Sequence, residues 1–394
     1  MRYVDQMDIE GERVLLRVDL NVPLDGGRVA DDSRILAVLP TIRHILERNG
    51  RLIITSHLDR PGGKRVPGLS LRPVSERLSD ILGKEVAFVE EVVGPDVSEA
   101  VGAMSPGSAI MLENLRFEPG EEKNDDALSK ALASHADVYI DDAFANAHRS
   151  HASNVGVTKY LHDKGGGLLF KRELEMLEGA LETPERAFVV VIGGAKVASK
   201  IGVLEHLSRR ADRMLLGGTM ALPFLKAGGA EVGNYALDER TIDQARSIME
   251  GAGEDCIVLP VDFVVASGEG AAARVVSADD IEPDMQIGDI GPRTIEAFAL
   301  EIENARTVVW NGPMGMFEME SFSRGTRSVA EAIARSPAFS LAGGGDTNRA
   351  LDRYGLREEI SYVSTGGGAF LEILAGRELP AVQALESTGG PERA

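Results

Sequence analysis

Short apolar runs alternate with amphipathic segments along most of this 394-residue chain, and loops rich in Gly, Asp, Asn, Arg or His separate them. The apolar runs have the length of strands, whereas segments such as 35–46 and 73–82 place apolar residues on one helical face. Alternating strands and helices form parallel sheets with helices on both faces, so the pattern predicts an α/β fold. The apolar runs are residues 14–16, 52–55, 109–112, 138–140, 188–192, 214–216, 257–259, 307–310, 339–342 and 362–363.

The length of the chain predicts two domains, because 394 residues exceed what one hydrophobic core usually organises. A run of three glycines at 165–167 marks the expected division. The next segment, 171–181, has leucines on one face; it either connects two α/β halves or is a plain surface helix. In parallel sheets ligands bind beyond the carboxyl ends of the strands, which is where the polar loops fall.

The chain is acidic, with a formal net charge of −20 and a pI near 4.9. This charge argues against wrapping of nucleic acid, and an anionic substrate therefore requires a local cluster of cations. The single cysteine, Cys256, excludes an internal disulfide and a cysteine-based zinc site, and its apolar surroundings predict a core residue. We see neither a signal peptide nor an apolar run long enough for a membrane span, so we expect a soluble, cytoplasmic protein.

Cations and small polar residues follow the apolar runs of the first half. Taken singly, each arginine is an ordinary surface charge, but several at successive strand ends would converge on one crevice. Arginine binds phosphate and carboxylate in a bidentate manner, so the set predicts a small, highly anionic substrate. The residues are Arg17, Asp19 and Asn21 in RVDLNVP, Arg34 in DDSRI, His57 and Arg60 in SHLDRPGG, Arg116 in LENLRF, and His148, Arg149 and His151 in DAFANAHRSHAS.

Two other kinds of site receive little support from the sequence. The spacing of His148 and His151 allows metal binding, but no HExxH is present and the intervening Arg149 opposes a cation. No GxSxG occurs, so a catalytic serine is unsupported.

The second half contains a stretch, AFVVVIGGAKVASK at 187–200, that predicts a buried strand, a glycine pair and a helix. Lys196 and Lys200 fall on one face of that helix, and a helix N-terminus with lysines beside it suits phosphate. It is not a Walker P-loop, since no GxxxxGK[ST] occurs. A strand-to-helix turn with two solvated lysines is the alternative.

Two further glycine-rich loops predict nucleotide contacts. In GGGDTN (343–348) backbone amides, a Thr347 hydroxyl and an Asp346 carboxylate suit phosphate and Mg²⁺, although either side chain is also a common helix N-cap. In WNGPMGMFE (310–318), Pro313 and Met316 offer an apolar platform for a base, and Glu318 is either a ribose ligand or a solvated carboxylate. The absence of GxGxxG weakens the rival interpretation of a dinucleotide-dependent dehydrogenase.

Nine segments, in order, resemble the phosphoglycerate kinase family over nearly the whole chain, from Arg17 to about Leu385. They are RVDLNVP, SHLDRPGG, LENLRF, DDAFANAHRSHAS, GGAKVASKI, DIGP, VVWNGPMGMFE, GGGDT and STGGGAFLE. The resemblance implies two lobes, each a three-layer α/β/α, Rossmann-like domain with a parallel sheet. A connecting helix would join them, with a cleft between. The implied domains are 1–169, completed by a returning segment 377–394, and 170–376.

The resemblance also implies a cytoplasmic, monomeric enzyme of glycolysis and gluconeogenesis that closes its lobes to transfer a phosphoryl group between MgATP and the carboxylate of 3-phosphoglycerate. A non-catalytic binder of phosphorylated metabolites is the rival, but it would not need Lys196, Asp346 and Thr347. The implied glycerate ligands are Asp19, Asn21, Arg34, His57, Arg60, Arg116 and Arg149. The implied nucleotide ligands are Gly193, Lys196, Lys200, Gly218, Asn311, Pro313, Glu318, Gly344, Gly345, Asp346 and Thr347, with Asp346 toward Mg²⁺ and with Arg34 and Lys196 as catalytic cations.

The chain departs from the family pattern in three segments. Asp59 stands where the family usually has glycine, and its carboxylate either weakens substrate binding or pairs with a neighbouring arginine. Ala198 and Ser199 precede Lys200 where an aspartate is common at 199, and Ala145 and Asn146 replace other small or β-branched residues.

Overall fold

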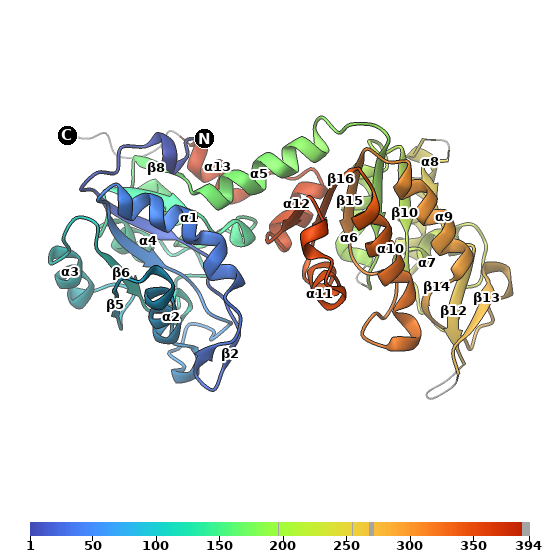
Figure 1. The fold of residues 1–394 in the computed structure, drawn as a ribbon, viewed down its shortest axis with the longest axis horizontal. Coiled ribbons are helices and arrows are strands. Elements are labelled where there is room, and N and C mark those ends of the chain that lie inside the picture. The colour runs from blue at the N-terminus through green and yellow to red at the C-terminus, as the bar shows by residue number, and fades with distance from the viewer. Residues whose placement is uncertain (196, 254, 268–271, 388–394) are drawn as a thin grey trace. The chain divides into compact units, whose positions relative to one another are not determined.

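The computed structural model describes residues 1–195, 197–253, 255–267 and 272–387, which form two compact units. Unit 1 comprises Met1–Leu174 and the described chain from Glu378 onward, and unit 2 comprises Glu175–Arg377 (Figure 1). The segment 171–181 is part of helix α5 (Leu168–Leu181). The predicted domain boundary at 169/170 falls inside this helix. The division into domains 1–169 with 377–394 and 170–376 stays a prediction.

Unit 1 contains a six-stranded parallel sheet in the order β5-β6-β4-β1-β7-β8. The chain runs outward from β1 to β4, β5 and β6 and then crosses to β7, so the direction of winding reverses between β1 and β7. The strands are β1 (Arg13–Arg17), β4 (Arg51–Thr55), β5 (Val86–Val89), β6 (Ala109–Leu112), β7 (Val138–Asp141) and β8 (Asp163–Gly166). A small hairpin, β2 (Leu24–Asp25) with β3 (Arg28–Val29), and the helices α1 (Ser33–Glu47), α2 (Arg72–Leu82), α3 (Pro95–Gly102), α4 (Asp126–Ala133) and α13 (Pro380–Glu386) complete the unit.

Both faces of this sheet are buried. Side chains alternate between the faces along a strand, so Val14 and Leu16 point to one side and Leu15 to the other. Val14 and Leu16 pack in one core with apolar residues of α1 and α2, whereas Leu15 and Ile53 are equally buried on the opposite face. This is why the strands appear in the sequence as continuous apolar runs.

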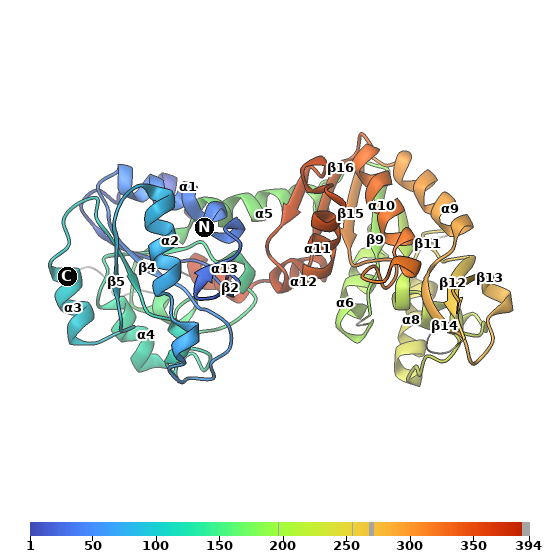
Figure 2. The ribbon, with the colours of Figure 1, turned by 60° about the horizontal axis from the view of Figure 1, so that its bottom comes forward.

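Unit 2 repeats the architecture with a parallel sheet in the order β11-β10-β9-β15-β16-β17. Helices lie on both sides of each parallel sheet (Figures 1 and 2). Its strands are β9 (Phe188–Ile192), β10 (Arg213–Leu216), β11 (Ile257–Val258), β15 (Thr307–Asn311), β16 (Phe339–Gly343) and β17 (Tyr362–Ser364). Its helices besides α5 are α6 (Val197–Leu207), α7 (Leu222–Ala227), α8 (Glu239–Gly251), α9 (Pro292–Glu303), α10 (Arg324–Arg335), α11 (Gly345–Tyr354) and α12 (Gly368–Leu374).

Unit 2 also contains an antiparallel sheet that the sequence pattern did not predict. Its strands are β12 (Asp262–Ala266), β13 (Arg274–Ser277) and β14 (Gln286–Ile290), in the order β13-β12-β14. Val275, on the edge strand β13, is exposed, so the apolar signal there is weak. The sheet matters for the site because β14 leads directly into the loop before α9.

Helix termini follow local rules that the sequence contains. Asp125 and Asp238 accept backbone N–H groups of Leu128 and Thr241, each at 2.9 Å, and so cap α4 and α8. Gly83 ends α2 in the left-handed conformation, with φ of 62°. The predicted α/β class, with two parallel-sheet units, is confirmed, and Cys256 is buried as expected. Within the described residues, no helix combines the length and the apolar character needed to cross a bilayer.

Candidate active site

The polar loops of unit 1 meet at one edge of its sheet because β1, β4, β6 and β7 are parallel and in register. Arg34, in the first turn of α1, forms an ion pair with Asp19 in the loop after β1. The side chain of Asn21 accepts the backbone N–H of Asp59 at 2.8 Å. Arg116 donates to the carbonyl of Asp59 at 2.7 Å, so three loops are held together around this residue.

The remaining predicted residues of unit 1 lie around this group. His57 is buried just after β4. Arg116 is also buried, and its charge acts on His57. Arg149 is half-buried, and its carbonyl accepts from the Asn154 side chain at 2.9 Å. Arg60 is exposed, and within the described chain its side chain has no recorded hydrogen bond or ion pair. The structure therefore brings the predicted residues to one sheet edge, where Arg60 is exposed.

The electrostatics of this edge are those of crowded cations. Burial lowers the pKa of Arg116, and the nearby Arg17 and Arg149 lower it further against the opposing effect of Glu122. Burial alone would raise the pKa of the Asp19 carboxyl, but the neighbouring Arg34 and Arg17 and the backbone N–H of Asn21 hold it below its usual value. Such a concentration of positive charge in a chain with net charge −20 favours an anionic ligand.

His151, one of the two histidines considered as metal ligands, lies beside a buried carboxylate. The Nδ1 atom of His151 lies 3.7 Å from a carboxylate oxygen of Glu121, inside the unit. No set of three or more His, Cys, Asp or Glu residues in the described ranges is arranged to hold a metal ion.

In unit 2 the glycine pair after β9 is enclosed by the loop after β15. The backbone N–H of Gly194 donates to the Pro313 carbonyl at 2.7 Å, and a Cβ on Gly193 would lie 2.1 Å from that oxygen. Only glycine fits so close an approach. Lys200, in α6, reaches back and donates to the Gly193 carbonyl at 2.6 Å. Lys196 and the side chains of Ala198 and Ser199 lie outside the described residues.

Burial lowers the pKa of the Lys200 ammonium to about 8, with a smaller opposing effect from Asp346. A lysine held in this way gains from a phosphate group, because an anion restores the stability that the ammonium loses on leaving water. The alternative of a solvated lysine is therefore wrong for Lys200, whose side chain is buried.

The loops after β15 and β16 are joined by hydrogen bonds. The side chain of Asn311 donates to the Gly343 carbonyl at 2.7 Å, and the Thr347 hydroxyl accepts the N–H of Gly312 at 2.7 Å. Gly344, with φ of 106°, occupies the N-cap position of α11, so Asp346 and Thr347 stand in its first turn and are not its caps. Gly345 begins the helix, which leaves its first N–H groups at the carboxyl edge of the sheet.

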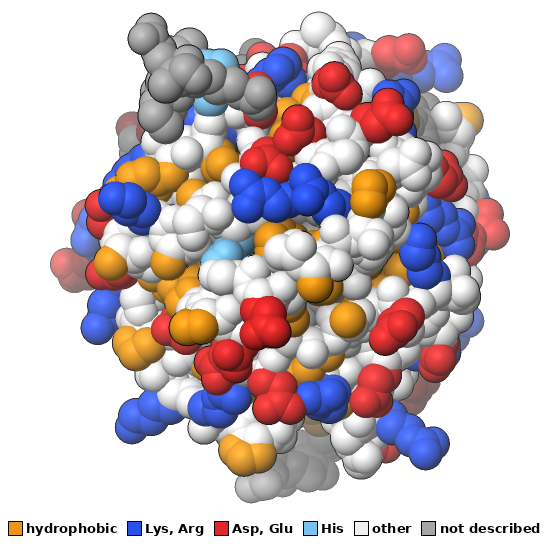
Figure 3. Space-filling model, turned by 90° about the vertical axis from the view of Figure 1, so that its left-hand side faces the viewer, with side chains coloured by type: hydrophobic (Ala, Val, Ile, Leu, Met, Phe, Trp, Pro, Cys, Tyr) orange, Lys and Arg blue, Asp and Glu red, His pale blue; other side chains and the backbone are white. Residues whose placement is uncertain are grey.

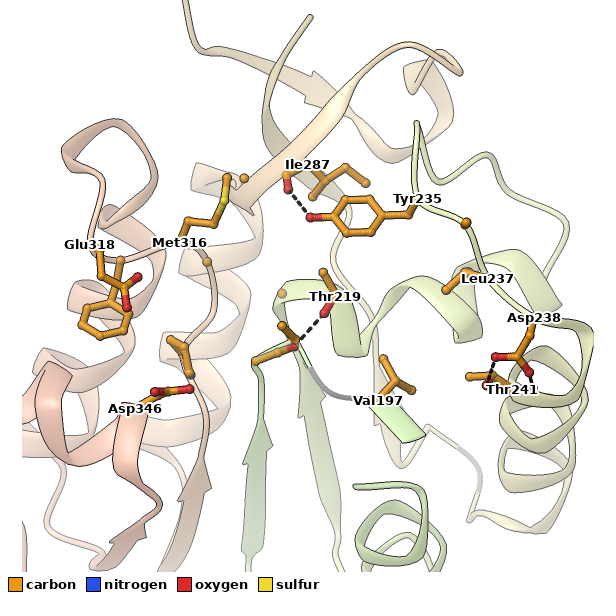
Figure 4. Close-up of a pocket in the computed structure, with 18 residues that line it drawn as sticks. Val197, Thr219, Tyr235, Leu237, Asp238, Thr241, Ile287, Met316, Glu318 and Asp346 are labelled. Atoms are coloured by element: carbon orange, nitrogen blue, oxygen red, sulfur yellow. Dashed lines mark hydrogen bonds between the residues drawn. The ribbon is translucent and has the colours of Figure 1, made fainter. Parts of the chain in front are cut away.

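A pocket of about 490 Å³ opens beside these loops (Figure 4). Glu318 and Asp346 lie on one side of it and Tyr235 and Ile287 on another, and Thr219 and Val197 also line it (Figure 4). Its volume is in the range of small-molecule sites. Of the predicted nucleotide ligands, Gly218, Pro313, Glu318 and Asp346 line the pocket, whereas Gly193, Lys200, Asn311, Gly344, Gly345 and Thr347 form the adjoining loops.

Several pocket residues were not found from the sequence. Tyr235 is half-buried and donates its hydroxyl to the Ile287 carbonyl at 3.2 Å. Thr219 donates to the Gly194 carbonyl at 2.8 Å. An aromatic residue shortly after Gly233 and before the capped helix α8 is the signal that could have identified Tyr235. Other pocket residues not predicted include Leu237, Asp238 and Thr241.

Asp346 fits a role in binding Mg²⁺. Its carboxylate is exposed at the pocket and forms an ion pair with Arg349 at 2.7 Å, and Arg349 also lies 3.4 Å from Glu318. Mg²⁺ is commonly bound by one or two carboxylates together with substrate phosphates, so a single hard oxygen donor beside a phosphate site is sufficient. Glu318 is thus paired with Arg349 in this structure.

Comparisons with known proteins agree with this geometry. The family model described as phosphoglycerate kinase matches residues 4–377. The chain is 46% identical over 395 residues to the phosphoglycerate kinase of Geotalea uraniireducens (strain Rf4), covering 99% of each protein. It is 48% identical over 394 residues to that of Rubrobacter xylanophilus (strain DSM 9941 / JCM 11954 / NBRC 16129 / PRD-1), covering 100% of this chain and 98% of the relative.

The solved structures give the same result. The structure of phosphoglycerate kinase from Coxiella burnetii is 41% identical, with a TM-score of 0.89 and coverage of 98% of each chain. That from Pyrococcus horikoshii OT3 is 34% identical, with a TM-score of 0.85 and the same coverage. Sequence similarity over the full length, a shared fold and loops that group the same motifs together show that this chain belongs to the phosphoglycerate kinase family.

Proposed function

We propose that this enzyme transfers the γ-phosphoryl group of MgATP reversibly to the carboxylate of 3-phosphoglycerate, giving 1,3-bisphosphoglycerate and MgADP. The observation that supports this most is the pairing of two sites. Unit 1 has a cluster of cations at the carboxyl edge of its sheet, and unit 2 has a 490 Å³ pocket bordered by Lys200, Asp346 and glycine-rich loops. The first suits a small polyanion and the second a nucleotide.

In unit 1 the side chains position the acceptor. Arg60, Arg116 and Arg149 would neutralise the phosphate and carboxylate of 3-phosphoglycerate, while Asp19 and Asn21 would hold its hydroxyl group. The acceptor carboxylate is already ionised at neutral pH, so its oxygen attacks the γ-phosphorus without losing a proton. The bond from that phosphorus to the bridging oxygen of ADP breaks, and no general base is required.

In unit 2 the side chains and backbone hold the donor. Lys200 and the first N–H groups of α11 would contact the phosphate chain, and Pro313 and Tyr235 would flank the base. Mg²⁺, held by Asp346 and the phosphates, would supply charge neutralisation at the phosphate oxygens. Arg349 would have to share or release Asp346 for this to occur. We assign stabilisation of the transferring group to Lys196 and Arg34.

Each unit supplies groups for only one of the two substrates, so we infer that the units close during turnover and that closure excludes water from the phosphoryl group. We further propose a cytoplasmic monomer without nucleic-acid or membrane partners. On the face drawn in Figure 3, acidic and basic side chains are intermixed.

A coupled assay tests the function. With 3-phosphoglycerate and MgATP, product formation is followed through glyceraldehyde-3-phosphate dehydrogenase and NADH. We expect turnover in the wild type and a fall in kcat of about 10³-fold in Arg34→Ala and in Lys196→Ala, as for other charge-stabilising groups in phosphoryl transfer. Arg43→Ala, on the exposed face of the same helix α1, is the matched control for Arg34 and should turn over normally. A folded wild type without activity would reject the proposal, and near-normal turnover would remove either cation from the transition state.

A further inference from the structure

Arg17 is a buried cation behind the predicted substrate ligands. It is the last residue of β1 and is only 1% exposed, so it offers almost no surface to a ligand. Its Nε donates to the Ser153 hydroxyl at 2.9 Å, and one terminal nitrogen donates to the Val18 carbonyl. The other terminal nitrogen lies 3.2 Å from Nδ1 of His57. Arg17 therefore acts on its neighbours within unit 1.

The contact with Arg17 determines where the proton of His57 resides. A guanidinium group has only donors, so the hydrogen bond to His57 exists only if Nδ1 is the acceptor. The neutral imidazole must then have its proton on Nε2. A second proton, at Nδ1, would remove the hydrogen bond. The N–H of a positively charged imidazole would then face the N–H of the positively charged Arg17.

A buried carboxylate fixes the orientation of Arg17. Glu121 is fully buried, and its two oxygens accept the Ser153 hydroxyl at 2.6 Å and the Ser153 backbone N–H at 3.0 Å. Because the hydroxyl donates its single proton to Glu121, its oxygen can only accept from Arg17. The direction of the chain of hydrogen bonds is thus set, from Arg17 through Ser153 to Glu121.

The charges around these hydrogen bonds are consistent with the direction from Arg17 through Ser153 to Glu121. Burial would raise the pKa of Glu121, but the contacts with His151, Arg17 and Ser153 hold it below its ordinary value, so the carboxylate stays ionised and balances Arg17.

The groups that face His57 are Asp19, Arg17, Arg116 and Arg34. Burial lowers the pKa of His57 well below its ordinary value, and the three arginines lower it further against the single opposing charge of Asp19.

We propose that Arg17 and Glu121 are positioning residues that hold His57 as the neutral tautomer with its proton on Nε2, so that His57 donates a hydrogen bond to the acceptor substrate. The identity of that substrate rests on the proposed function; the state of the imidazole does not. His57 then differs in kind from Arg34, Arg60, Arg116 and Arg149, which bind as cations. His57 would contribute one directional hydrogen bond to the substrate without adding a further positive charge to the site.

The test is long-range ¹H–¹⁵N NMR on the full chain labelled with ¹⁵N-histidine, with the His57 signals assigned by their loss in His57→Gln. We expect an unprotonated Nδ1 and a protonated Nε2 in the wild type, without titration between about pH 6 and 8. A doubly protonated ring near neutral pH, or a proton on Nδ1, would overturn the proposal. This measurement needs no substrate, so it can succeed even if the kinase assay fails.

Variants separate positioning from folding. In Arg17→Met and in Glu121→Gln we expect a mixture of tautomers at His57 and titration within the same pH range. The KM for 3-phosphoglycerate should rise about 10-fold, equivalent to about 1.4 kcal/mol, while the KM for ATP stays unchanged. Arg51→Met, which removes an arginine at the amino end of β4 that donates to the Gly11 carbonyl at 2.9 Å, is the control and should alter neither quantity. If Arg17→Met does not fold, the spectra of Glu121→Gln and of the wild type still test the proposal. An unchanged His57 tautomer in a folded variant would contradict it.

Discussion

Asp59 has a left-handed backbone, with φ of 53°, at the centre of the loops that form the cationic edge of unit 1. Its backbone N–H and carbonyl bind Asn21 and Arg116, whereas its carboxylate has no recorded hydrogen bond or ion pair in the described ranges. The alternative that the carboxylate pairs with a neighbouring arginine is therefore not what the structure shows. Its backbone conformation favours glycine, which is the residue that the resemblance to the family leads us to expect at this position.

We predict that Asp59→Gly improves both stability and substrate binding. Glycine adopts this φ freely, so the unfolding free energy should rise by up to about 1 kcal/mol. Removal of an exposed negative charge beside the cations should also lower the Kd for 3-phosphoglycerate, measured by titration calorimetry. Asp59→Asn separates the two effects, since it removes the charge but keeps a side chain. An unchanged or weaker affinity in both variants would show that the carboxylate points away from the substrate.

Tyr235 is the residue of unit 2 for which the pocket makes the clearest prediction. Its ring lines the pocket and its hydroxyl is anchored to Ile287, so Tyr235→Ala should weaken ADP binding by about 1–2 kcal/mol, or roughly 5- to 30-fold. Tyr235→Phe keeps the ring and should lose little of this. The matched control is Tyr354→Phe, which removes a hydroxyl that donates to the Ser323 carbonyl at 3.3 Å outside the pocket. Equal affinities in wild type and Tyr235→Ala would place the base elsewhere.

The sequence predicts site residues that lie in loops at strand ends better than it predicts residues whose role depends on contacts distant in the chain. Asp19, Arg34 and Arg116 could be predicted because polar side chains follow apolar runs at known strand ends. Arg17 was noted in the same loop, but a sequence does not show that its side chain turns inward to Ser153. Tyr235 was missed because its place depends on Ile287, 52 residues away in the chain.

At the scale of elements, the start of α5 is held by a buried acid. Asp142 is fully buried after β7 and accepts the backbone N–H of Phe170 at 2.9 Å. Burial raises the pKa of its carboxyl to about 7. Because the folded state binds this proton more tightly than the unfolded chain, the contribution is fully present below about pH 4 and is lost as the pH rises through about 7.

We therefore predict that Asp142→Asn reduces the pH dependence of stability. The unfolding free energy of the wild type should fall between about pH 4.5 and pH 8, and the fall should be smaller in the variant, as measured by urea unfolding. Part of the slope should remain, because burial also raises the pKa of Asp141 to about 6 and that of Asp289 to about 7. Asp80→Asn, at an exposed position of α2, is the control. A slope identical to that of the wild type would mean that Asp142 does not titrate in this range.

The parallel strands and most helices could be predicted because strands buried on both faces give continuous apolar runs and the intervening helices give one apolar face. The antiparallel sheet could not. Its edge strand β13 is largely exposed and its neighbours are interrupted by Asp262 and Asp289, whose buried carboxylates bind backbone N–H groups of Thr294 and Gly325. Because Asp262 and Asp289 bind backbone groups of neighbouring segments, they interrupt the apolar pattern by which a strand is recognised in the sequence.

In the whole molecule, two units would each provide half of the proposed reaction. The cations of unit 1 would bind a polyanionic acceptor, and the pocket of unit 2 would bind a nucleotide. The fold class and the family could be inferred from the order of nine short segments, since each lies at a strand end or a helix start that the structure confirms. Closure of the units and the residues that touch the transferring group remain predictions, because no local pattern encodes them.

In the proposed reaction the acceptor is a carboxylate, and ATP is consumed only through it. The direct measurement is incubation with MgATP, 3-phosphoglycerate and hydroxylamine, which converts an acyl phosphate into a hydroxamate. We predict one hydroxamate for each ADP formed, and neither product when 3-phosphoglycerate is omitted. ADP formation without hydroxamate would show that the phosphoryl group goes to water or to a hydroxyl group, and it would contradict the account.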